Sequence, residues 1–383
     1  MKNFFTLILL LTILGITSTS NATPTVAASN VTFTNLTTTS FRVNWTSGNG
    51  TTAIVVVRPS GNSVAFPANG NTIYTPSTVY GSGYNLGSSN YVVYNGGLNS
   101  VTVTGLAIGT SYRVTIFEYE FDAFQFRNEY LTSSYPNVFQ YTLDSEPTTS
   151  ASTLTVTSIA PTTAYVSWAS GSGARRIVSV RAASTNFILP VDGTAYSSSS
   201  TYGIGTDLGS GAYVVYSSTG SGLTIFGLTP ETQYSIAVFE YNGLSGAQNY
   251  RTSGYATFSF YTQAAEPTVS ASTLAFTQVT NNSITVNWQN GNGVKRIVTA
   301  KAASTNTHTP SDFTGYTASS TFGSGSQIGA TGAYVVYNGT DNYVTVTGLS
   351  AQTMYAFTVY EYNGTSVATY NYCLLYTSPS PRD

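Results

Sequence analysis

One block of sequence occurs three times in this chain and sets its organisation. Each occurrence has the pattern Gly-Leu-x-x-x-Thr-x-Tyr, and each is followed by a Phe/Tyr-Glu-Tyr triplet. The blocks end at Tyr112, Tyr234 and Tyr355, so the period is 122 residues and then 121. Repeats that stack into solenoids are about 20–50 residues long. The longer period therefore predicts three whole domains in series.

Each copy has one tryptophan, at the end of an alternating segment. In the first copy Phe41, Val43 and Trp45 share one face, while Arg42 and Asn44 take the other. The later copies place the triplets Ala164-Val166-Trp168 and Ile284-Val286-Trp288 at the same positions. Alternation with a period of two is typical of a strand with one buried face. Because burying an indole removes about 200 Å² from water, we expect the tryptophans to anchor three cores.

Further segments of each copy repeat the strand signal. A Gly-x-Gly turn follows each tryptophan strand, at residues 48–50, 171–173 and 291–293. A Gly-, Ser- and Tyr-rich insertion then ends in Tyr-Val-Val-Tyr, which begins at residues 91, 213 and 334. With about seven short strands per copy and no helical periodicity beyond residue 22, the sequence predicts an all-β chain of three tandem immunoglobulin-like Greek-key sandwiches.

The N-terminus has the pattern of an export signal. Lys2 supplies a positive end, residues 4–16 an apolar run, and Ser20-Asn21-Ala22 a small-residue cleavage site. We expect a signal peptide over 1–22, domains over 23–145, 146–264 and 265–372, and a secreted or cell-surface location. A proline begins each copy, and the short Pro-containing linkers suit an extended connection.

The last eleven residues differ from the rest of the repeat. The second copy continues after Asn249-Tyr250 into an alternating segment that ends at Thr262, whereas the third copy breaks after Asn371-Tyr372 into residues 373–383. That string resembles a translated sequencing adapter. We therefore expect 373–383 to be an artefact, the third domain to lack its last strand, and the chain to be a fragment of a larger protein. The alternative is a natural Ser/Pro-rich end.

Composition excludes several partners. The net charge is −2 and charged residues make up 7% of the chain, against about 25% in typical soluble domains. Such a chain offers no electrostatic footprint for nucleic acid. No segment after residue 22 is apolar enough for a membrane span. The single cysteine, Cys373, allows no intrachain disulfide, so the domains depend on their cores.

The tryptophan strand, the Gly-Leu pair and the tyrosine that starts a later strand together resemble fibronectin type III domains. The resemblance implies that Tyr112, Tyr234 and Tyr355 form tyrosine corners, in which the phenol bonds to backbone near the preceding turn. Each copy is longer than the usual sandwich of about 100 residues, and in this the chain resembles the enlarged repeats of secreted Bacteroidetes-type bacterial proteins. Such repeats accompany another domain, often an enzyme or a sorting signal.

The recurring acidic residues are the strongest candidates for a special role. Glu118, Glu240 and Glu361 each occupy the Phe/Tyr-Glu-Tyr triplet, on the core-facing phase of their strand. We expect each carboxylate to accept backbone N–H bonds from the loop that follows it. A cation site is the alternative, but calcium requires six or more oxygen ligands and no second acidic residue recurs nearby.

Basic residues and the histidine carry weaker signals. Arg175-Arg176 and Lys295-Arg296 begin a strand where the first copy has Thr52-Ala53, which favours solvated strand ends over a polyanion contact. His308 is the one histidine, and Ile188 takes its place in the second copy, so a catalytic or zinc role is not expected.

We predict no catalytic, cofactor-binding or metal-binding residues and no cofactor in this region. The favoured function is a non-catalytic extracellular interaction or spacer array with an unknown protein or polysaccharide partner. Two alternatives remain: an accessory region of an extracellular hydrolase whose catalytic domain is missing, and a polysaccharide-binding module that uses loop tyrosines such as Tyr202.

Overall fold

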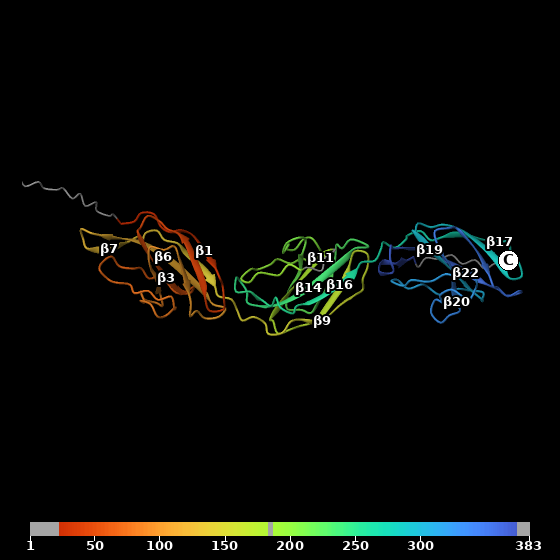
Figure 1. Ribbon diagram of the computed structural model, residues 1–383, viewed down its shortest axis with the longest axis horizontal. Helices are drawn as coiled ribbons and strands as arrows, with labels where there is room; N and C mark the ends of the chain where they lie inside the picture. Colours follow the sequence, from red (N-terminus) through yellow and green to blue (C-terminus); the bar gives the residue numbers. More distant parts are fainter. Residues whose placement is uncertain (1–22, 183–186, 374–383) are drawn as a thin grey trace, which may run out of the picture. The chain divides into compact units, whose positions relative to one another are not determined.

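The computed structural model describes residues 23–182 and 187–373. The predicted signal peptide, and all of the predicted adapter segment except Cys373, lie outside these residues. The described residues divide into two compact units: one runs to Ser145 and includes Gly243–Gln248, and the other comprises Glu146–Asn242 and the residues from Asn249 onward. The first unit contains one β-sandwich and the second unit contains two (Figure 1).

The first sandwich has two antiparallel sheets. One sheet has the order β1-β2-β5, and the other has the order β4-β3-β6-β7, with β8 also paired to β6. The strands are β1 (Ser29–Thr34), β2 (Phe41–Thr46), β3 (Thr52–Pro59), β4 (Tyr91–Gly96), β5 (Ser100–Val103), β6 (Ser111–Asp122), β7 (Arg127–Tyr130) and β8 (Asn137–Tyr141). Sequential strands change sheets between β2 and β3, between β4 and β5, and between β5 and β6, as in a Greek-key sandwich.

The second sandwich repeats this topology strand for strand. Its sheets have the orders β13-β10-β9 and β12-β11-β14-β15, with β16 paired to β14. The strands are β9 (Ser152–Thr157), β10 (Ala164–Ala169), β11 (Arg175–Ala182), β12 (Tyr213–Ser218), β13 (Gly222–Ile225), β14 (Gln233–Asn242), β15 (Asn249–Tyr250) and β16 (Ala256–Tyr261).

The third sandwich has sheets with the orders β17-β18-β21 and β20-β19-β22-β23. Its elements are β17 (Ser272–Thr277), β18 (Ser283–Gln289), β19 (Lys295–Lys301), β20 (Ala333–Gly339), β21 (Tyr343–Thr347), β22 (Ala356–Asn363), the 3₁₀ helix η1 (Val367–Thr369) and β23 (Asn371–Tyr372). Up to residue 373, where the description ends, it has no counterpart of β8 or β16.

The predicted all-β fold class is confirmed: the described residues form three tandem Greek-key sandwiches of the immunoglobulin-like kind. The alternation around each tryptophan produces the core between the two sheets. In the first sandwich Phe41, Val43 and Trp45 lie buried there with Val114 and Ile116. The count of about seven strands per copy was one too low for the first two sandwiches. The loop after the Phe/Tyr-Glu-Tyr triplet folds back onto β6 or β14 as an additional short strand, β7 or β15.

The Tyr- and Gly-rich insertion forms a second core that the sequence did not predict. In the first sandwich Tyr74 from the insertion packs with Ile54, Val56 and Phe117 on the outer face of the larger sheet. Corresponding clusters form around Ile177 and Phe239, and around Ile297 and Tyr360. The larger sheet is thus covered on both faces, which explains why β3 is buried almost continuously rather than on alternate residues.

Candidate functional site

The recurring tryptophan lies in the core between the sheets of each sandwich. Trp45, Trp168 and Trp288 are 4%, 5% and 4% exposed. Each ring packs against the second tyrosine of Tyr-Val-Val-Tyr, with centroid separations of 5.6, 5.4 and 5.6 Å for Tyr94, Tyr216 and Tyr337. These tyrosine partners were not predicted. Their constant position after the insertion was the available signal.

The recurring tyrosine of the Gly-Leu block binds backbone of its own turn. The phenolic oxygens of Tyr112, Tyr234 and Tyr355 accept the N–H of Ala107, Thr229 and Ser350 at 3.0, 3.0 and 2.9 Å. The structure thus places each phenol five residues from its donor, which is the geometry of a tyrosine corner.

The loop tyrosine Tyr202 belongs to this corner rather than to an open binding face. Its ring lies 5.2 Å from Tyr234 in an edge-to-face contact. Its hydroxyl donates to Gly211 O at 3.2 Å and accepts the N–H of Ala182 at 3.3 Å. Burial raises the pKa of Tyr202. Tyr202 is therefore engaged in internal packing, and the hypothesis that it contacts polysaccharide is not favoured by its position.

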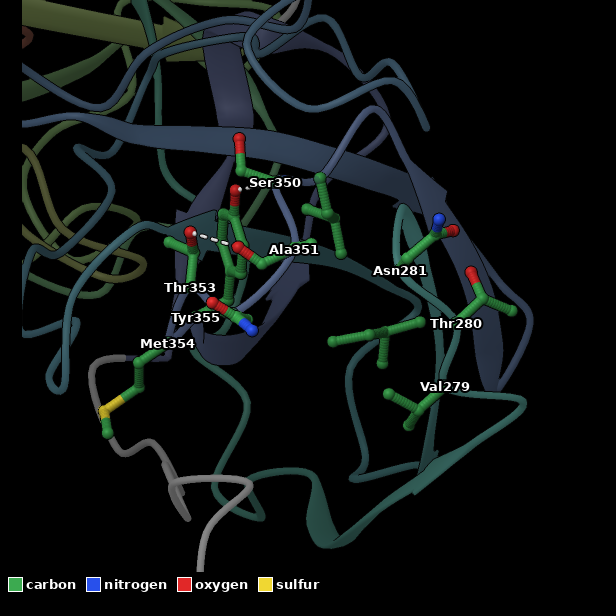
Figure 2. Close-up of a pocket in the computed structure, with 11 residues that line it drawn as sticks. Val279, Thr280, Asn281, Ser350, Ala351, Thr353, Met354 and Tyr355 are labelled. Atoms are coloured by element: carbon green, nitrogen blue, oxygen red, sulfur yellow. Dashed lines mark hydrogen bonds between the residues drawn. The ribbon is translucent and has the colours of Figure 1, made fainter.

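A pocket opens beside the tyrosine corner of the third sandwich (Figure 2). Tyr355 and Ser350 line one side of it, and Val279 and Thr280 the other. In the first sandwich Leu143, just beyond β8, reaches the corresponding turn and donates its N–H to Thr37 O at 3.0 Å. Thr37 and Thr280 begin equivalent turns, since each donates its N–H to the serine three residues on. The pocket therefore corresponds to the position of a last strand.

The recurring glutamates bind the turn that follows the tryptophan strand. Oε1 of Glu118, Glu240 and Glu361 accepts the N–H of Gly48, Gly171 and Gly291, at 2.9 Å in each case. The prediction that each carboxylate accepts a backbone N–H is confirmed. The predicted donor, the loop that follows the glutamate, is wrong. The donor comes from a turn about 70 residues earlier in the chain, because the larger sheet brings that turn beside the end of β6, β14 or β22.

The same turn also holds the first residues of each domain. Oδ1 of Asn49 accepts the N–H groups of Thr25 and Val26 at 3.0 and 2.8 Å. Ser172 and Asn292 bind the equivalent segments before β9 and β17. The second glycine of the turn faces the carboxylate: a Cβ on Gly173 would lie 2.7 Å from Glu240 Oε2. The close approach of neighbouring atoms to these glycines therefore explains the Gly-x-Gly pattern.

Arg176 and Arg296 are buried, and both earlier interpretations of them, a polyanion contact and a solvated strand end, are wrong. Each lies directly opposite the recurring glutamate in the sheet register. Arg176 Nη2 is 3.2 Å from Glu240 Oε2, and Arg296 Nε is 3.1 Å from Glu361 Oε1. The arginine side chains are 4% exposed and the glutamates 0%. The sequence signal was the joint presence of Arg and Glu in these two copies.

Backbone carbonyls complete the binding of each guanidinium. Arg176 donates to Gly173 O at 3.1 Å, to Gly220 O at 3.1 Å and to Thr219 O. Arg296 donates in the same way to Gly293 O at 3.0 Å and to Thr340 O and Asp341 O. The planar donor set of arginine thus joins the Gly-x-Gly turn, the turn after β12 or β20, and the carboxylate.

The first sandwich keeps the carboxylate but lacks the arginine. Ala53 stands opposite Glu118 in the register. Among the described residues no lysine or arginine forms an ion pair with Glu118. Burial raises the pKa of Glu118, and the N–H groups of Gly48 and Gly50 partly offset that effect.

The remaining candidate side chains do not come together as a site in the part of the chain that the structure describes. No cluster of three or more His, Cys, Asp and Glu side chains there has the arrangement of a metal site. His308 Nε2 lies 3.1 Å from Lys301 Nζ. No helix within these residues combines the length and the apolar character that membrane crossing requires.

No protein-family model and no curated protein matches the chain. Among solved structures it is similar to the FN1–FN3 domains of chicken CNTN1, at 11% identity and a TM-score of 0.29, over 94% of this chain and 99% of that one. It is also similar to a two-domain fibronectin type III segment of chicken tenascin, at 14% identity and a TM-score of 0.28, over 61% of this chain and 99% of that one. TM-scores this low do not support a fold assignment by themselves. The fold is assigned from the strand order described above.

Proposed function

We propose that the chain is a non-catalytic array of fibronectin type III-like domains that spaces or docks other molecules outside a bacterial cell. One observation carries this proposal: the side chains that recur at fixed positions serve the backbone of their own domain. Trp168 fills a core, Tyr234 binds its turn, and Glu240 joins that domain's Gly-x-Gly turn to its last long strand. Because these contacts within a domain are repeated from one domain to the next, they suit a structural array.

The proposal includes a secreted or cell-surface location and a Bacteroidetes-type origin. The basic and apolar N-terminal residues followed by Ser20-Asn21-Ala22 support export, and the enlarged repeat supports the origin. An accessory role beside an extracellular hydrolase is the alternative. Sequencing the gene beyond the codon of Tyr372 separates the two, because only the second requires a catalytic domain.

A recess on the second sandwich gives the polysaccharide alternative a specific site. Phe187, Tyr255 and Phe258 line it together with Thr257 and Ser259. Phe66 and Tyr135 form a related edge-to-face pair in the first sandwich, with ring centroids 5.5 Å apart. Aromatic rings beside hydroxyl groups give a large amphipathic contact area at low entropy cost. These rings are better placed for a ligand than Tyr202.

Expression of the full chain in a bacterial host tests the main proposal. We expect the chain outside the cytoplasm, with Thr23 as its first residue by mass spectrometry, and accessible to protease added to intact cells. Retention in the cytoplasm with residues 1–22 attached would contradict it. A glycan array tests the alternative, with Tyr255→Ala and Tyr202→Phe compared: loss of binding in the first variant alone would favour the recess.

A further inference from the structure

Within the second compact unit, the third sandwich binds the segment of chain that leaves the second sandwich. That segment passes through Ala264, a buried residue just beyond β16. Ala264 donates its N–H to Thr369 O at 2.9 Å, and its own O accepts Nδ2 of Asn371, also at 2.9 Å. Thr369 and Asn371 are buried as well. Both backbone groups of this linker residue are therefore satisfied by the third sandwich.

A side-chain pair adds a contact beside Ala264. Gln263, the preceding residue, is buried and donates from Nε2 to Oδ2 of Asp312 at 2.8 Å. The other carboxylate oxygen of Asp312 accepts the N–H of Tyr372 at 2.9 Å. Asp312 thus connects the end of the second sandwich to β23 of the third.

Glu231 contacts the third sandwich from the tyrosine-corner turn of the second. Its Oε1 accepts the N–H of Thr365 at 2.8 Å, and the hydroxyl groups of Thr365 and Thr369 donate to it at 3.1 and 3.2 Å. The backbone of Glu231 has a φ of 52°, in the left-handed region that favours glycine. Such strain persists where other contacts compensate for it. The hydrogen bonds to the third sandwich are contacts of that kind.

The first sandwich shows that its fold does not need these two side chains. Gly109 donates its N–H to Leu143 O at 3.0 Å, and Glu231 donates its N–H to Gln263 O at 3.2 Å, so the two pairs are equivalent. The φ of Gly109 is 59°, close to that of Glu231. A glycine and a leucine are thus sufficient to close a sandwich of this kind. The polar side chains of the second pair serve the junction.

We infer that the second and third sandwiches form one rigid pair, and that the side chains of Glu231 and Gln263 hold it together. Domains of one chain move relative to each other by default. Here, relative movement would have to break the contacts of Glu231 and Gln263 and strain those of the buried linker. The inference adds a rigid segment to the proposed spacer array. It depends neither on export nor on a ligand, so its failure would leave the proposed function standing.

Residual dipolar couplings of the backbone amides, measured by NMR on the full chain, test the rigid pair. Couplings from β11 and β14 report on the second sandwich, and those from β19 and β22 report on the third. We expect all four strands to fit a single alignment tensor. A separate tensor for each sandwich would show independent motion and would overturn the inference.

The variant Glu231→Gly/Gln263→Leu tests the two side chains, because it introduces the residues that the first copy has at these positions. The β14 amides should keep their hydrogen-exchange protection. The Ala264 amide should lose about tenfold, as expected for two hydrogen bonds of ordinary strength, and the two sandwiches should no longer fit one tensor.

Two further variants are the controls. Glu231→Gln keeps an acceptor oxygen and should preserve the single tensor. Gln352→Gly changes the equivalent turn of the third sandwich, where φ is 56°, and should leave the Ala264 amide unchanged. A single tensor and unchanged Ala264 protection in the double variant would refute the role of Glu231 and Gln263. If the double variant does not fold, the couplings of the unmodified chain still decide whether the pair is rigid.

Discussion

Replacing Arg176 with methionine should weaken the second sandwich far more than loss of a surface ion pair. The change keeps an unbranched apolar stem but removes the guanidinium, and so leaves Glu240, whose side chain is 0% exposed, without its cation. Removing one partner of a buried pair costs about 3–5 kcal/mol, because the remaining charge stays out of water. The carbonyls of Gly173 and Gly220 also lose a donor. Exposed pairs contribute about 0–1 kcal/mol.

Hydrogen exchange of the full chain measures this cost within one sample. The amides of β14 report on the altered sandwich, and those of β6 and β22 serve as internal references. A loss of 3–5 kcal/mol lowers protection in β14 by about two to three and a half powers of ten, at 1.4 kcal/mol per factor of ten. We expect β6 to keep its protection.

The double variant Arg176→Met/Glu240→Leu decides whether the cost comes from the stranded charge. Replacing both partners of a buried pair with apolar side chains is often near neutral, so the double variant should regain most of the lost protection. A single variant that costs less than about 1 kcal/mol, or a double variant as unstable as the single one, would refute the reasoning.

Three further predictions follow from the same contacts. Burial raises the pKa of Glu118, so the folded first sandwich favours the protonated acid. Its contribution to stability is full below the unfolded pKa and is lost as pH rises through the folded pKa. Glu118→Gln should flatten this fall in thermal melts recorded at increasing pH from the ordinary glutamate pKa upward. Tyr234→Phe removes the acceptor of the Thr229 N–H and should cost about 1–3 kcal/mol in denaturant titration; a cost near zero would contradict the tyrosine corner. Gly173→Ala would place a Cβ 2.7 Å from Glu240 Oε2 and should cost about 1–3 kcal/mol, whereas Gly61→Ala meets nothing within 4 Å and should be neutral by the same measurement.

Local patterns in the sequence were sufficient to predict the sandwich fold. The alternation around Trp45, and the spacing that puts Val114 and Ile116 on the buried face of their strand, depend only on neighbouring residues. This is because side chains of a strand alternate between its two faces. The second core was missed because Tyr74 lies in a Gly-rich insertion without periodicity. The continuous apolar run of Ile54 to Val57 was its one local sign.

The site was predicted in part. Glu240 was identified from its recurrence, but its partners Gly171 and Arg176 precede it by 69 and 64 residues, and local pattern does not set pairing at that distance. Arg176 was mistaken for a solvated residue because arginine is rarely buried without a partner. The correlated presence of Arg and Glu in two copies, and of Ala and Glu in the first, was the signal that identifies the site.

The amide of Gly171 tests the central claim most directly. Each recurring glutamate supports the turn of its own domain and no other. In Glu240→Ala, residue-resolved hydrogen exchange should show the Gly171 amide losing its protection while the amides of Gly48 and Gly291 keep theirs. Unchanged protection of Gly171, or equal loss at all three glycines, would contradict it.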